Sequence, residues 1–167
     1  MGRKWLMVVW LTILFSGCGK EPFFEFDQAD HYHISLSEDD LQKLDQANND
    51  QKAQLKKGII FEDFPENVAD TFFIKNLKAM GFIKKEIPNQ KLTVMHDLFK
   101  ENSTFVREVA RCEPEFKDIV VFRNKSKIAG IAKLCFECDK HWIVGSRVSI
   151  EDFGQHGEFE ALKKLLD

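Results

Sequence analysis

An uninterrupted apolar run at residues 119–122 (Ile-Val-Val-Phe) places the strongest constraint on the fold of this chain. Side chains of a strand point alternately to its two faces, so the run is apolar on both faces and predicts an interior strand over 118–123. The polar segment 124–127 predicts a turn, and residues 128–136 predict the returning strand of a hairpin. Residues 141–148 have a third strand pattern, so we expect an antiparallel meander here.

Helical patterns precede and follow this meander. Ser37 before an acidic turn predicts an N-cap and a helix toward Lys57, with a break near Asn48, where the residues are poor helix formers. Apolar stripes predict further helices over 67–80 and 90–100. A closing amphipathic helix is marked by Phe159, Leu162, Leu165 and Leu166. The predicted class is α+β, with N-terminal helices followed by an antiparallel β-meander and a C-terminal helix.

An alternating segment at residues 31–36 predicts a half-buried strand ahead of the first helix. Its apolar side chains share one face, and His31 and His33 share the other. Two histidines on one face of a strand can coordinate one metal ion together. No acidic or histidine partner stands at a useful spacing, however, so we interpret this face as exposed and polar.

The N-terminus has the layout of a secretory signal. Arg3 and Lys4 precede an uncharged, mainly apolar run over 5–15, and small residues follow it. As a helix this run would span about 16 Å, which is too short for a hydrocarbon core of about 30 Å. We therefore expect a cleaved signal rather than a membrane-spanning anchor.

Phe15-Ser16-Gly17-Cys18 resembles the bacterial lipobox, although leucine is usual where Phe15 stands. The resemblance implies cleavage before Cys18 and a diacylglyceryl group on its thiol. Gly19 follows in place of Asp, which by resemblance to the sorting rule of two-membrane bacteria implies the outer membrane. The expected organisation is a lipoprotein signal peptide over 1–17, a tether over 18–28 and a single α+β domain over 29–167.

The composition limits the partners of the mature chain. Without Arg3 and Lys4, 22 basic residues stand against 27 acidic ones, for a net charge of −5. No basic stripe with interleaved aromatic residues is present, so nucleic acid is not expected as a partner. The expected contacts are the membrane, through the lipid anchor, and an unidentified protein or ligand.

One stretch resembles a known group of proteins. Residues 111–146 hold the predicted hairpin, which ends in Cys135-Phe136-Glu137-Cys138. A hairpin ending in Cys-Phe-x-Cys is similar to one shared by small proteins and lipoproteins of Bacteroidota. That resemblance brings no activity, cofactor or site residue with it.

Three cysteines remain once Cys18 carries lipid, and an oxidising envelope compartment favours disulfides. In a hairpin that turns near 125–126, position 112 lies opposite positions 138–139, so we favour a bond between Cys112 and Cys138 over one with Cys135. A second reading joins Cys112, Cys135, Cys138 and His141 in a Cys₃His zinc set. A third uses Cys135 and Cys138 as a redox-active pair, although no helix follows them.

No catalytic constellation stands out in the sequence. There is no serine in a glycine-flanked elbow, no phosphate loop and no glycine-rich dinucleotide turn. We therefore expect no catalytic residue, and no cofactor beyond the lipid on Cys18 and the zinc of the second cysteine reading. The functional hypothesis is an outer-membrane lipoprotein that serves as a non-catalytic binding or envelope-structural module. The alternative is a metal-binding or thiol-active envelope protein that uses Cys112, Cys135 and Cys138.

Overall fold

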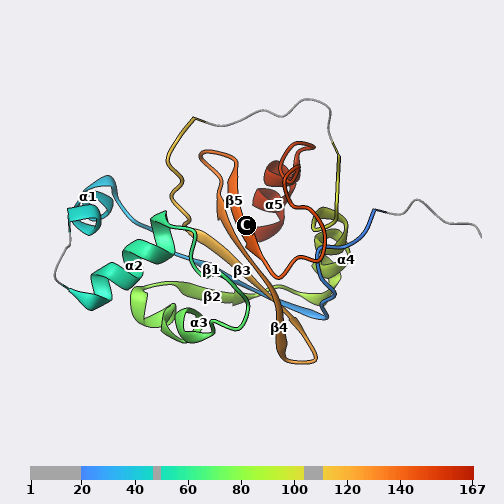
Figure 1. The fold of residues 1–167 in the computed structure, drawn as a ribbon, viewed down its shortest axis with the longest axis horizontal. Helices are drawn as coiled ribbons and strands as arrows, with labels where there is room; N and C mark the ends of the chain where they lie inside the picture. Colours follow the sequence, from blue (N-terminus) through green and yellow to red (C-terminus); the bar gives the residue numbers. More distant parts are fainter. Residues whose placement is uncertain (1–19, 47–49, 104–110) are drawn as a thin grey trace, which may run out of the picture.

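A five-stranded antiparallel sheet forms the centre of the computed structural model, which describes residues 20–46, 50–103 and 111–167 (Figure 1). The order of the strands across the sheet is β2-β1-β3-β4-β5. Their bounds are Gln28–His33 for β1, Ile83–Glu86 for β2, Asp118–Asn124 for β3, Lys127–Cys135 for β4 and Lys140–Val144 for β5.

Helices lie on both faces of this sheet. The described helices are α1 (Glu38–Gln46), α2 (Gln51–Phe61), α3 (Phe72–Asn76), the short 3₁₀ helix η1 (Lys78–Met80), α4 (Asn89–Leu98) and α5 (Glu158–Leu166). The class is α+β, as the sequence predicts. None of the helices in the described part of the chain has both the length and the apolar character needed to cross a membrane.

The predicted elements differ from the observed ones in several places. The strand expected over 141–148 ends at Val144, and the strand expected over 31–36 runs instead over Gln28–His33. The helix expected over 67–80 is confined to α3 and η1, because Asn67 and Asp70 lie in turns that precede it. Strand β2 was not expected, since its four residues are all exposed and lack a hydrophobic alternation. Strand β1 joins the sheet between β2 and β3, so the sheet is not a simple meander of consecutive strands.

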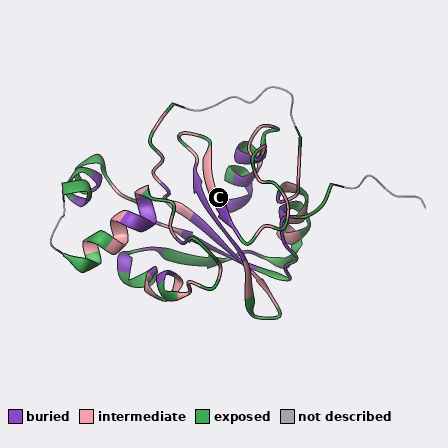
Figure 2. Cartoon of the chain, in the orientation of Figure 1, coloured by how far each residue is buried: buried purple, intermediate pink, exposed green. Residues whose placement is uncertain are grey.

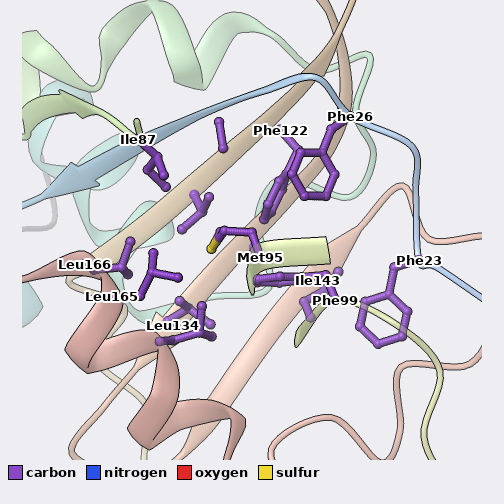
Figure 3. Packing of buried hydrophobic residues seen from close by; sticks show 14 of the residues in the cluster. Phe23, Phe26, Ile87, Met95, Phe99, Phe122, Leu134, Ile143, Leu165 and Leu166 are labelled. Carbon is purple, nitrogen blue, oxygen red and sulfur yellow. The ribbon is translucent and has the colours of Figure 1, made fainter. Parts of the chain in front are cut away.

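Two hydrophobic clusters hold these layers together, one on each face of the sheet. Helices α1, α2 and α3 pack over one face, where Ile119, Val121 and Ile131 point. Helices α4 and α5 pack over the other face, where Val120 and Phe122 point (Figure 3). Figure 2 shows buried residues along the central strands and on the inward sides of helices. The apolar run of β3 is thus buried on both faces, as its sequence predicts.

The hairpin of β3 and β4 turns at Lys125 and Ser126. Both have positive φ angles, 48° and 67°, which is the backbone of a two-residue turn of type I′. The backbone amide of Lys125 donates to the side-chain carboxylate of Asp27, which supports the turn. The predicted polar turn is therefore confirmed, together with the two strands that it joins.

The segment predicted as a tether enters the core within its described part. Phe23, Phe24 and Phe26 are buried, and the amide of Phe23 donates to the carbonyl of Phe99 at the end of α4. The Phe24 ring occupies the space over Gly130 of β4, where a Cβ atom would lie 2.3 Å from the ring. The packed domain therefore begins before residue 29. Burial of the three phenylalanine side chains is favoured because it removes their apolar surface from water. Cys18 lies outside the described residues.

Candidate functional site

A pocket of about 420 Å³ opens on the α5 face of the sheet, where β1 ends and β3 begins. Helix α5 covers the middle of this face with Leu162 and Leu165, and the pocket lies beside the last turn of the helix. Its lining includes His31, His33, Asp118, Lys85, Lys163 and Phe136. The pocket therefore combines two imidazoles, charged groups of both signs and an aromatic side chain.

His31, His33 and Asp118 form the polar centre of the pocket. The Nε2 atom of His31 lies 2.7 Å from Oδ1 of Asp118, and Nδ1 of His33 lies 2.9 Å from the same oxygen. One atom from each residue can be chosen so that all three lie within 4.8 Å of one another. In the described part of the chain, this is the one group of at least three histidine, cysteine or acidic residues that meets this distance.

The sheet itself brings the three side chains together. Residues two apart in a strand share a face, so His31 and His33 of β1 both point toward the side of α5. In the antiparallel pair of β1 and β3, His33 stands opposite Asp118 and His31 stands opposite Val120. Val120 belongs to the core cluster on this face, so Asp118, two residues earlier, points to the same side.

Burial differs among the three groups. The side chains of His31 and Asp118 are 9% and 13% exposed, whereas that of His33 is 45% exposed. The Nε2 atom of His33 lies 3.2 Å from the Ser35 hydroxyl, a contact that helps to orient its ring. The site thus has a buried side anchored in the sheet and a side that solvent reaches.

Lys85 closes one wall of the pocket. This β2 residue stands opposite His31 in the sheet, and its ammonium donates to the carbonyl oxygens of Leu166 and Asp167, at 3.2 and 3.0 Å. Carbonyls at the end of a helix lack partners within the helix and carry partial negative charge. The lysine therefore fixes the end of α5 against the sheet beside the two histidines.

The interpretation of the histidine face as exposed and polar is wrong for His31, which is buried. The expectation that the histidines lack an acidic partner is also wrong. Asp118 forms hydrogen bonds with both rings, although it lies 87 residues after His31 and 85 residues after His33. Spacing along the sequence does not reveal such a partner. The available signals were a His-x-His pair on a strand and an acidic residue at the start of an interior strand.

The structure brings Cys112 and Cys138 to disulfide distance, with 6.1 Å between their Cα atoms, as the hairpin order predicts. Cys135 is buried and free, and burial raises the pKa of its thiol. His141 packs against Phe153, with ring centroids 5.0 Å apart, and burial lowers its pKa. Among the described residues, these cysteines and His141 do not converge in a group of ligand atoms.

A buried lysine lies on the opposite face of the sheet. Lys133 of β4 is fully buried, its ammonium donates to the carbonyl of Glu62 at the end of α2, and it lies 4.4 Å from the centroid of the Phe116 ring. Burial lowers its pKa from 10.5 to about 7. The end of a helix and an aromatic face both favour a cation, which explains how the core accommodates this group.

Together these features define a small α+β domain with a pocket of mixed polar and apolar lining on one face of an antiparallel sheet. No protein-family model, curated protein or solved structure matches the chain.

Proposed function

We propose that this chain is an outer-membrane lipoprotein, anchored through lipid on Cys18, and that its folded domain is a non-catalytic binding module. The support for the anchor is the order of the first residues: two cations, a short apolar run, and Ser16-Gly17 directly before Cys18. Acyl chains contribute about 0.8 kcal/mol for each buried CH₂, so several chains on one cysteine hold a protein durably on a membrane.

The fold is compatible with a short connection to such an anchor. Phe23 is already buried in the core, and it lies five residue steps after Cys18, with four residues between them. Even fully extended, five residues span at most about 17 Å. A lipid on Cys18 would hold the domain close to the membrane surface.

The observation that carries the binding role is the pocket lined by His31, His33 and Asp118. A concave site with a few convergent polar groups is the usual form of a ligand site. The same pocket is mixed in character, with Phe136 and Ile83 beside the charged groups. This mixed lining suits a small ligand that has both polar and apolar groups.

The thiol-active alternative is less well supported. A reactive cysteine needs a thiolate that solvent can reach. Burial holds the pKa of Cys135 above its usual range, and Cys112 and Cys138 are bonded to each other. The non-catalytic binding module is therefore the better supported of the two functions.

Membrane fractionation of a Cys18→Ser variant tests the anchor. The wild type should partition with outer membranes, resist extraction by high salt and incorporate labelled fatty acid. The variant should lose all three properties, and the matched Cys135→Ser variant should keep them. Salt-resistant membrane association of Cys18→Ser would overturn the lipoprotein proposal.

A further inference from the structure

We infer that His31, His33 and Asp118 form a binding site for one divalent first-row transition-metal ion, with Zn²⁺ as the reference ion. This inference rests on the proposed role of the pocket as the binding site of the module, and it names the ligand. It does not depend on the lipid anchor, because the three residues lie within the folded domain. It also differs from the cysteine-based zinc set, with which it shares no residue.

The ligand atoms of the three residues lie close together. Both imidazoles approach the same carboxylate oxygen, Oδ1 of Asp118, at 2.7 and 2.9 Å. Around a tetrahedral zinc ion with bonds near 2.0–2.1 Å, ligand atoms stand roughly 3.3 Å apart. An ion therefore fits after each nitrogen moves about half an ångström away from Oδ1 and the two nitrogens, which lie within 4.8 Å of each other, settle about 3.3 Å apart. Rotation of the half-exposed His33 ring supplies part of this movement.

The chemistry of the ligand atoms determines which metal ions the site prefers. Two imidazole nitrogens and one carboxylate oxygen suit Zn²⁺, Fe²⁺, Ni²⁺ or Cu²⁺. Ca²⁺ and Mg²⁺ prefer sets made of oxygen atoms alone. The carboxylate of Asp118 also supplies negative charge in a position that is only 13% exposed. The site should therefore discriminate against Ca²⁺ and Mg²⁺.

The strands that carry the three ligands make the site rigid. All three residues lie on β1 and β3, which are interior strands of the sheet, and His33 stands directly opposite Asp118. Ligands held on paired strands keep their geometry better than ligands on loops. The Ser35 hydroxyl near Nε2 of His33 adds an orienting contact outside the ligand set. The domain thus holds the site largely formed before an ion arrives.

The three residues are accessible from the pocket that they line. Three protein ligands leave one position of a tetrahedral ion open, which is typical of sites that bind a further ligand rather than of closed structural sites. Here that position faces the pocket, where Lys163 and Glu137 also line the wall. A water molecule or a small anion can complete the coordination from this side.

The test uses the full chain purified in detergent, with its Cys112–Cys138 bond intact. Zn²⁺ binding is measured by calorimetry and by metal content after dialysis, and Co²⁺ is used as a spectroscopic probe. His33→Gln and Asp118→Asn remove one ligand each. His156→Gln is the matched control, because its side chain is 41% exposed, close to the 45% of His33, and lies outside the pocket.

We expect one Zn²⁺ per wild-type chain, and affinity reduced by at least about tenfold in both ligand variants but unchanged in the control. The Co²⁺ spectrum should lack the charge-transfer band that thiolate ligands produce. Failure of the wild type to bind Zn²⁺ would overturn the metal site. So would binding that survives both ligand variants but disappears after cysteine alkylation.

The two proposals can fail separately. Salt-resistant membrane association of Cys18→Ser would remove the lipid anchor and leave Zn²⁺ binding untouched. Lack of Zn²⁺ binding in a correctly anchored chain would remove the metal site and leave the lipoprotein. His33→Gln is the decisive ligand variant if Asp118→Asn disturbs folding, because His33 is half-exposed and its loss leaves no buried charge unpaired.

Discussion

Replacement of Lys133 by methionine should remove the contribution of this group to the pH dependence of stability between about pH 7 and pH 10.5. The Lys133 side chain is fully buried in β4, and its ammonium donates to the carbonyl of Glu62. Burial lowers its pKa from 10.5 to about 7, because desolvation outweighs the attraction of the Asp63 and Glu62 carboxylates. Methionine has a similar length and no charge, so it fills the same space without this titration.

Whether stability rises or falls with pH depends on which state, folded or unfolded, binds the Lys133 proton more tightly. Below about pH 7 Lys133 is protonated in both the folded and the unfolded chain, so the free energy of unfolding is reduced by the full cost of burying its charge. Between about pH 7 and pH 10.5 mainly the unfolded chain carries this proton, so stability rises with pH by up to about 1.4 kcal/mol per pH unit. Above about pH 10.5 neither state carries it, and the cost is gone.

This linkage gives a magnitude that can be measured. From about pH 7 to about pH 9.5, the wild type should gain roughly 3 kcal/mol of unfolding free energy relative to Lys133→Met. Urea unfolding of both proteins across this range gives the difference directly, since other titrating groups are common to both. The exposed Lys127 of the same strand provides a control, and Lys127→Met should follow the wild type. Parallel pH profiles for wild type and Lys133→Met would refute the reasoning.

Three further outcomes are expected. Cys112→Ser should lower the unfolding free energy by about 3.5 kcal/mol in the chain-entropy model, because the disulfide joins residues 26 positions apart. Urea titration measures this change, and an unchanged midpoint would contradict it. Gly130→Ala should cost about 1–3 kcal/mol, because its Cβ would lie 2.3 Å from the Phe24 ring, and a thermal melt without a lower midpoint would contradict this. The Cys135 thiol should react much more slowly with iodoacetamide in the folded chain than in denaturant, since burial shields it and raises its pKa; equal rates by mass spectrometry would contradict this.

Much of the fold was accessible from the sequence because its signals are local. The apolar run of β3, the polar turn after it and the amphipathic pattern of α5 each lie within a few consecutive residues. The proximity of Cys112 and Cys138 also followed, because a hairpin fixes which positions stand opposite each other. The lipidation of Cys18 stays a prediction, since that residue lies outside the described part of the chain.

The remaining features depend on contacts between distant segments. Strand β1 takes its place between β2 and β3 through pairings that span much of the chain. That placement buries His31 and supplies Asp118 as a partner, neither of which periodicity within β1 can indicate. The sequence by itself determined that His31 and His33 share one face of a strand. Only the tertiary structure decided what lies opposite them, because the register of nonlocal strands is set by packing of the whole sheet.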